Sequence, residues 1–274
     1  MSFLMAPIEE SMDMDSDNYG GNCISTALLL AAGTGSRLLP LTKNSPKCLT
    51  LVNEKSILER LVNNLKKQGF KRLVIITGFQ KECIMDFLGS QSGNLTIEYV
   101  NSPLYRITNN IYSLWMARNI IDEPFVLFES DLVLHSSLLD EMMFPDRMAV
   151  AQMEPWLKGT TVSVNGLNQV TQFQKGTTAL YSDIRYKTVN IYSFSLSSWQ
   201  AIVKRLNQFI SKGSINCYYE VVFSDMIDDG SLSLESVPFD HKPWCEIDTI
   251  DDLAAAEKLF PELEHHSMLE KESI

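Results

Sequence analysis

Short apolar runs alternate with amphipathic segments along the first half of the chain. Residues 26–30, 73–77, 96–100 and 125–129 are rich in apolar and β-branched side chains, which predicts short strands in a buried sheet. Between these runs, apolar positions three and four apart predict a helix that starts at Ser56 and ends at Gly69, and helices over 81–88 and 111–120. Strands that alternate with helices are typical of a parallel sheet with right-handed crossovers and helices on both faces.

The pattern changes after about residue 145. Segments 148–153, 160–164, 170–174 and 188–194 favour strands, and Gly159 and Asn165-Gly166 predict turns between them. Helices are predicted again over 196–210 and 219–227, followed by a strand over 232–237 and a helix over 250–259. We therefore predict one domain over 23–262 with a β-rich insertion at about 150–195. A flexible acidic extension over 1–22 would precede it, and a charged tail over 263–274 would follow it.

Charge and composition restrict the class of protein. The 274 residues include 34 acidic and 23 basic side chains, a net charge of −11, which disfavours a general nucleic-acid-binding protein. The five cysteines form no Cys-x-x-Cys pair and their number is odd, which disfavours a disulfide framework and a zinc ribbon. No apolar run reaches the roughly 18 residues of a membrane span, and the N-terminus lacks the basic region of a signal peptide. We expect a cytoplasmic protein that binds neither nucleic acid nor membranes.

A glycine-rich connection follows the first predicted strand. Gly33 and Gly35 would let backbone N–H groups approach a polyphosphate, while Arg37 and Lys47 would supply a planar and a compact cation. The alternative is a tight strand–helix turn with two surface cations. The dinucleotide-binding fingerprint requires a third glycine where Leu38 stands, and the Gly-Lys-Ser/Thr of a P-loop is absent.

The segment from Leu29 to Leu49 resembles the signature of the nucleotidyltransferases that load sugar phosphates and related small phosphates onto a nucleotide. Ten spaced positions match that signature: Ala31, Ala32, Gly33, Gly35, Ser36, Arg37, Pro40, Thr42, Pro46 and Lys47. The resemblance extends over about residues 25–260. It implies a Rossmann-like three-layer α/β/α fold of the nucleotide-diphospho-sugar transferase type, with a mostly parallel sheet and a smaller β-rich insertion.

The resemblance also implies roles for individual residues around this connection. Residues 31–35 (Ala31, Ala32, Gly33, Thr34 and Gly35) would wrap the nucleoside triphosphate. Arg37 would face the departing pyrophosphate, and Lys47 would lie over the reacting phosphate. Thr77 and Gly78, at the end of the second strand, would lie near the base.

Two acidic pairs lie far apart in the chain. Glu129 and Asp131 close a predicted strand, and Glu246 and Asp248 precede the last helix. Spacing alone leaves the second pair open to a solvated or helix-capping role. The segment 244–249 (WCEIDT), however, resembles the choline-phosphate and phosphonate cytidylyltransferase branch, which implies that Asp131, Glu246 and Asp248 hold Mg²⁺. Glu129 occupies a flanking position and would only tune the local charge.

Three further segments resemble the same branch, at 109–114, 186–192 and 218–220. The resemblance implies that Lys187 is a catalytic cation for the acceptor's phosphonate or phosphate; the alternative is a surface lysine on an edge strand. Asn109, Asn110 and Asn190 would recognise the base or the acceptor, although the first two could merely cap a helix. A primary amine would favour carboxylates such as Glu220, whereas a quaternary ammonium would require an aromatic box. Trp115 and Tyr192 are expected in the core.

The resemblance therefore implies a CTP-dependent cytidylyltransferase that transfers CMP to a small phosphonate such as 2-aminoethylphosphonate and releases pyrophosphate. Phosphocholine as the acceptor is the first alternative. A sugar 1-phosphate acceptor and a non-catalytic nucleotide-binding regulator are weaker alternatives. A nicotinamide dehydrogenase is disfavoured by Leu38. The oligomeric state and the choice of acceptor stay open at this point.

Overall fold

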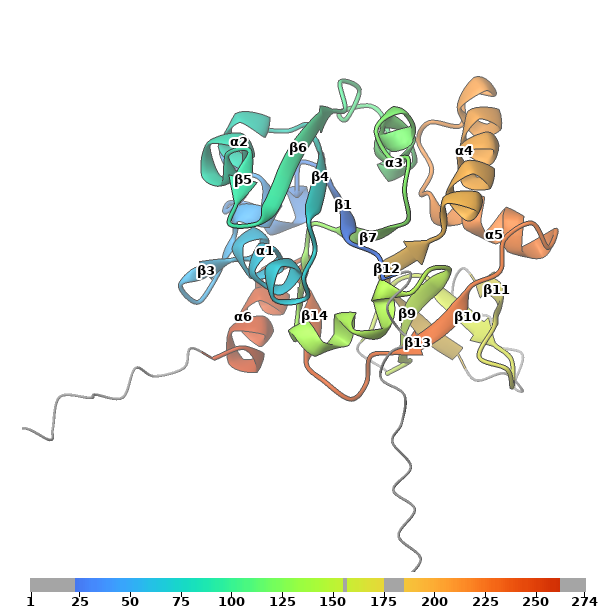
Figure 1. Cartoon of the computed structure of the whole chain (residues 1–274). Coiled ribbons are helices and arrows are strands. Elements are labelled where there is room, and N and C mark those ends of the chain that lie inside the picture. The colour runs from blue at the N-terminus through green and yellow to red at the C-terminus, as the bar shows by residue number, and fades with distance from the viewer. Residues whose placement is uncertain (1–22, 155–156, 175–184, 262–274) are drawn as a thin grey trace, which may run out of the picture.

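The computed structural model describes residues 23–154, 157–174 and 185–261, so the predicted extension 1–22 and tail 263–274 lie outside the described residues. Ten strands in these ranges form one mixed sheet (Figure 1). Its centre is parallel, in the order β7 (Phe125–Glu129), β1 (Thr26–Ala31), β4 (Arg72–Thr77) and β6 (Leu95–Asn101). This is the parallel arrangement that the alternation of strands and helices predicts.

The β-rich segment continues the same sheet beyond β7. Strand β12 (Arg185–Phe194) pairs antiparallel with β7, β10 and β9. The other strands of the sheet are β5 (Gln91–Ser92), β9 (Arg147–Gln152), β10 (Thr161–Val164), β11 (Val170–Gln174) and β13 (Glu235–Pro238). The Rossmann-like α/β/α fold class is thereby confirmed, with the β-rich part extending one side of the central sheet.

Helices cover the sheet on two faces (Figure 1). Alternate residues of the central strands point to opposite sides, so Leu73 and Ile75 pack with α1 (Ile57–Lys67) and α2 (Lys81–Leu88). Val74 and Ile76 pack on the other face with α3 (Asn110–Met116), α4 (Leu196–Ser211) and α5 (Glu220–Asp228). No helix in the described ranges is long and apolar enough to cross a membrane.

The helix ends follow local signals. Ser56 caps α1 by accepting a hydrogen bond from the Glu59 backbone N–H at 3.0 Å. The predicted helix at 111–120 is shorter, because its last turn tightens into a 3₁₀ helix with Ile120 N donating to Ala117 O. The 3₁₀ helices are η1 (Ser36–Leu38), η2 (Lys47–Leu49), η3 (Ala117–Asn119), η4 (Ser136–Leu139) and η5 (Glu141–Met143).

Two small two-stranded sheets stand beside the main one. Strand β2 (Leu51–Val52) pairs with β3 (Lys55–Ser56), and β8 (Leu132–Leu134) pairs antiparallel with β14 (Trp244–Glu246). The second pair leads into α6 (Ile250–Leu259) and is not predicted from the sequence. A separate apolar cluster underlies it, formed by Leu38, Val52, Ile57, Val133, Ile247 and Ala256. This cluster joins the glycine-rich connection to the C-terminal acidic segment.

Candidate active site

A cavity of about 300 Å³ opens at the carboxyl ends of β1 and β7. In open α/β sheets this edge is where ligands bind. The cavity is lined by twelve of the residues predicted for the site: Ala32, Gly33, Gly35, Arg37, Lys47, Asn109, Asn110, Asp131, Asn190, Glu220, Glu246 and Asp248. Six segments that are distant in sequence therefore contribute to one cavity.

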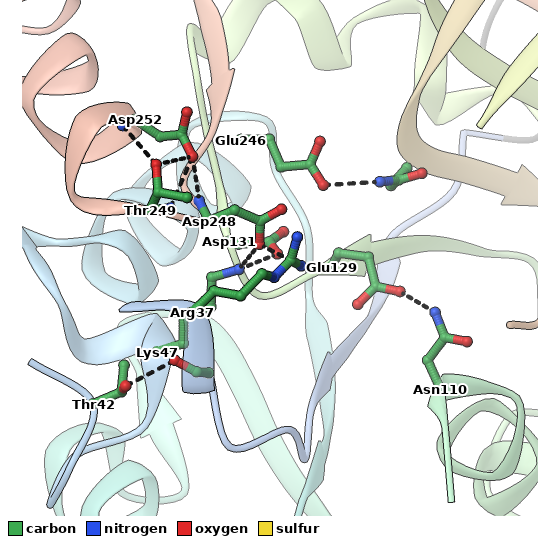
Figure 2. Close-up of polar contacts among 12 residues, drawn as sticks. Arg37, Thr42, Lys47, Asn110, Glu129, Asp131, Glu246, Asp248, Thr249 and Asp252 are labelled. Carbon is green, nitrogen blue, oxygen red and sulfur yellow. Dashed lines mark hydrogen bonds and ion pairs between the residues drawn. The ribbon is translucent and has the colours of Figure 1, made fainter. Parts of the chain in front are cut away.

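The glycine-rich connection fixes Lys47 by close packing. Gly35 has φ +62°, and a Cβ on it would lie 3.0 Å from the Lys47 Cβ. The Thr42 hydroxyl donates a hydrogen bond of 2.8 Å to the Gly35 carbonyl and holds the loop closed (Figure 2). A Cβ on Gly33 would meet nothing within 4 Å, so its backbone is open to the cavity.

Three carboxylates converge beside Lys47. Oxygen atoms of Asp131, Glu246 and Asp248 lie within 4.8 Å of one another. The Lys47 ammonium contacts Asp131 Oδ2 at 2.6 Å and Asp248 Oδ1 at 2.5 Å (Figure 2). The mostly exposed Arg37 reaches the same Asp248 oxygen at 2.8 Å. The structure thus brings together all three residues predicted as metal ligands and both predicted loop cations.

The positions of the three carboxylates follow from β8 and β14. Asp131 directly precedes β8, and Glu246 pairs with Leu132 in the antiparallel register. The Ile247 backbone N–H donates to the Asp131 carbonyl at 2.9 Å. Asp248 then lies just before α6, where Thr249 and Asp252 form a capping box. Thr249, not Asp248, is therefore the residue that caps this helix.

Lys187 lies behind the carboxylate cluster. Its Nζ contacts Glu246 Oε2 at 2.9 Å and donates to the Thr188 carbonyl at 2.9 Å, and the residue is only 2% exposed. The alternative of a surface lysine on an edge strand is therefore wrong. Asn190, with φ 61°, donates to Glu246 Oε1 at 3.4 Å and accepts from the Thr188 hydroxyl at 2.9 Å.

The cluster could hold a divalent metal ion. Three carboxylates form the hard, anionic oxygen set that Mg²⁺ prefers. Asp131 Oδ1 is buried and has no hydrogen-bond partner among the described residues, which leaves one oxygen of this set available to a ligand. The donor chemistry therefore fits a hard divalent cation.

Burial and charge shift the pKa values in this hollow. Burial lowers the pKa of Lys47, but attraction and hydrogen bonds to Asp131 and Asp248 outweigh that effect and leave it raised. Lys47 is therefore a cation at neutral pH. Burial raises the pKa of Glu246, and the charge of Asp131 raises it further against the attraction of Lys187.

A second acidic pair lies at the α3 side of the cavity. Glu129 Oε1 accepts from Asn110 Nδ2 at 3.1 Å, and Asn110 Oδ1 accepts from the Tyr219 backbone N–H at 3.0 Å. Burial raises the pKa of Glu129 well above its usual range, and the charges of Asp131 and Glu220 add to this shift. Asn109 caps α3, as its alternative role predicts, and also lines the cavity.

Four predicted nucleotide-binding residues do not line this cavity. Ala31 and Thr77 are buried at the ends of their strands, and Thr34 is exposed on the connection. Gly78 lines a neighbouring hollow of about 430 Å³. A Cβ on Gly78 would lie 2.7 Å from the Ala32 carbonyl oxygen and 2.9 Å from Tyr105, so close packing requires glycine there.

Sequence reasoning missed part of the cavity wall. Tyr105 and Thr108 lie in the connection between β6 and α3, which carries no motif. Of the aromatic side chains, Tyr105 and Tyr218 line the cavity within the described residues. Tyr192 is fully buried, and Trp115 packs against the core with Arg118 over its ring at 3.3 Å. The expectation that these last two belong to the core is consistent with their packing.

A glycine-rich loop, two lysines and three converging carboxylates at the carboxyl ends of parallel strands form an arrangement that suits phosphate groups and a metal ion. The profile of the nucleotidyl transferase family matches residues 26–164, about half of the chain, and the chain belongs to this family.

Named relatives carry related activities. A CMP-5'-(3-aminopropyl)phosphonate synthase from Streptomyces rubellomurinus is 28% identical over 89% of this chain. A 2-aminoethylphosphonate cytidylyltransferase from Lancefieldella rimae is 26% identical over 86% of this chain. The aligned part is 40% of the length of the first relative and 94% of the second. The match is thus to part of the first protein and nearly all of the second.

A solved structure has the same fold. The CTP:phosphocholine cytidylyltransferase of Streptococcus pneumoniae superposes with a TM-score of 0.72 at 23% identity, covering 86% of this chain and 99% of that chain. At this identity the likeness establishes the fold.

Proposed function

We propose that the domain over residues 23–262 is a CTP-dependent cytidylyltransferase. It would transfer CMP to a small phosphonate such as 2-aminoethylphosphonate and release pyrophosphate. The observation that carries the proposal is the contact of Lys47 with both Asp131 and Asp248, because a cation meets two carboxylates that could hold a metal ion at one point of the cavity. The names of the Streptomyces and Lancefieldella relatives support CTP and an aminoalkylphosphonate as the substrates.

In this reaction an acceptor oxygen attacks the α-phosphorus of CTP in line. The new P–O bond forms as the bond between the α-phosphorus and the oxygen that bridges it to the β-phosphorus breaks, and this oxygen leaves with pyrophosphate. A phosphonate is ionised at neutral pH, so the chain need not remove a proton from it. The work of the protein is therefore positioning and charge neutralisation. Lys47 would neutralise charge on the α-phosphoryl group, and Arg37 would face the departing pyrophosphate.

Asp131, Glu246 and Asp248 would hold Mg²⁺, which when bound supplies Lewis-acid stabilisation of the phosphate oxygens. In the structure their charges are balanced by the chain's own cations, Lys47 and Lys187. When a divalent ion occupies the carboxylates, the same two ammonium groups would be able to neutralise the charge of substrate phosphate.

The acceptor end favours a primary amine over phosphocholine. Lys187, which lies behind the cavity wall and is paired with Glu246, would be the cation for the phosphonate group, and Glu220 would supply a carboxylate in the same cavity wall as Asn190. A quaternary ammonium requires several aromatic faces. Trp115 and Tyr192 are used in packing, and among the described residues only two aromatic side chains, Tyr105 and Tyr218, line the cavity.

The test is pyrophosphate release from each nucleoside triphosphate with Mg²⁺. The acceptors are 2-aminoethylphosphonate, phosphocholine, glucose 1-phosphate and none. We expect turnover with CTP and 2-aminoethylphosphonate, and a loss of about 100-fold or more in Asp131→Asn, which keeps the shape of the side chain and removes its charge. The exposed Asp251→Asn is the matched control. Higher activity with UTP and glucose 1-phosphate, or an Asp131→Asn enzyme with more than a tenth of the wild-type rate, would reject the proposal.

A further inference from the structure

We propose that Glu129, together with Glu220, binds the ammonium group of the acceptor and makes the enzyme select acceptors that carry an amine. This inference rests on the proposed function, since it assigns the far end of the same acceptor. Glu129 would thereby be a specificity-determining residue and not only a flanking charge.

The first observation is the balance of charges in the cavity. Asp131 and Asp248 share Lys47, and Glu246 is paired with Lys187. Within residues 23–154, 157–174 and 185–261, no lysine or arginine forms an ion pair with Glu129. A partly buried carboxylate at low dielectric is stabilised by a cation. A cationic group on the substrate would supply the partner that the described residues do not.

The second observation is that Glu129 is held in place. Asn110 donates to Glu129 Oε1 at 3.1 Å and is itself fixed by the Tyr219 backbone N–H at 3.0 Å. The completely buried Tyr219 hydroxyl lies beside the carboxylates of Glu129 and Glu220, and apart from Glu129 it has no hydrogen-bond partner among the described residues. It is a polar group still available to an N–H donor. A carboxylate and a hydroxyl oriented in this way form a prearranged receptor for N–H groups.

The third observation is the position of Glu129 relative to the reacting centre. It ends β7, two residues before Asp131, and both side chains line the cavity. Figure 2 shows Glu129 reaching away from Asp131 towards Asn110, on the side opposite Asp248 and Thr249. A short acceptor with its phosphonate at the lysines would extend its other end towards Glu129. A primary ammonium offers three N–H donors to these acceptors, whereas a trimethylammonium offers none.

The test compares two acceptors of equal carbon chain, 2-aminoethylphosphonate and ethylphosphonate. For the wild type we expect kcat/KM with CTP to be at least about 100-fold higher for the amine-bearing acceptor, because a site built for N–H groups rejects an analogue that lacks them. Glu129→Gln keeps the shape of the side chain and removes its charge, and we expect it to reduce this ratio at least about tenfold. The exposed Glu257→Gln on α6 is the matched control and should leave the ratio unchanged.

The outcomes separate the two proposals. If no phosphonate supports pyrophosphate release from CTP, the proposed function fails. If both acceptors react equally well with the wild type, or if folded Glu129→Gln retains the wild-type ratio, the function stands and the ammonium site is refuted. Glu220→Gln provides a second measurement should Glu129→Gln not fold, with the same expected fall in the ratio. Glu129→Asp should retain part of the preference, because it keeps the negative charge.

Discussion

Replacing Lys47 by methionine would separate the electrostatic role of its ammonium from the packing of its stem. The lost contacts are those to Asp131 Oδ2 at 2.6 Å and Asp248 Oδ1 at 2.5 Å. The three side chains are only 11%, 16% and 18% exposed, so two carboxylates would be left close together with little water. Arg37 would still contact Asp248, but its own side chain is 69% exposed.

Removing one partner of a buried ion pair costs about 3–5 kcal/mol. We expect the lower end, about 3 kcal/mol, because each of the three side chains keeps some contact with solvent. For a domain of this size, 1 kcal/mol lowers Tm by about 2–4 °C, so Lys47→Met should melt about 6–12 °C below the wild type. The variant is expected to be less stable only if Lys47 is charged in the folded wild type. Its raised pKa keeps Lys47 charged at neutral pH.

The assay is thermal unfolding with and without Mg²⁺. A ligand that binds only the folded state raises Tm, and it should do so more strongly in Lys47→Met, where no ammonium competes for the carboxylates. The exposed Lys43→Met is the control for loss of a lysine in the same connection. A Tm of Lys47→Met within about 2 °C of the wild type, or an Mg²⁺ response no larger than that of the wild type, would refute the reasoning.

Two further variants test the loop and the buried lysine. Gly35→Ala should destabilise the fold by about 1–2 kcal/mol in denaturant unfolding, because Gly35 has φ +62°, whereas Gly33→Ala should change stability little because a Cβ there meets nothing within 4 Å. Equal losses for the two alanines would contradict this account. Lys187→Met should raise KM for the phosphonate acceptor at least about tenfold and KM for CTP far less, measured by steady-state pyrophosphate release. An equal rise in both KM values would show that Lys187 does not act on the acceptor.

Elements with strong local signals could be predicted from the sequence. The predicted bounds of β7, β11, α2 and α6 coincide with those in the structure. An apolar run between polar residues defines a buried strand, and a capping box such as Thr249 with Asp252 marks a helix start. The end of α3 lacks such a signal, and there the predicted helix is too long by the residues that form the 3₁₀ turn.

The convergence of the site could not be derived from local patterns. Strands β8 and β14 have three residues each, too few to show a period, and their pairing joins segments more than a hundred positions apart. Lys47 is 84 positions from Asp131 and 201 positions from Asp248. The family resemblance supplied these residues together, whereas spacing alone left Glu246 and Asp248 open to a solvated role.

The apolar packing around β8 and β14 provides the favourable free energy that offsets the cost of bringing the charged site residues together. Three carboxylates with oxygens within 4.8 Å repel one another, and burial adds a desolvation cost, so the cluster does not stabilise the fold by itself. Directly beneath it, Leu38, Val133 and Ile247 are nearly completely buried in one apolar cluster. Leu38 directly follows Arg37, and Ile247 directly precedes Asp248. Val133 lies two positions after Asp131. Burial of the apolar side chains therefore drives the segments together, and the charged neighbours are brought into contact as a consequence.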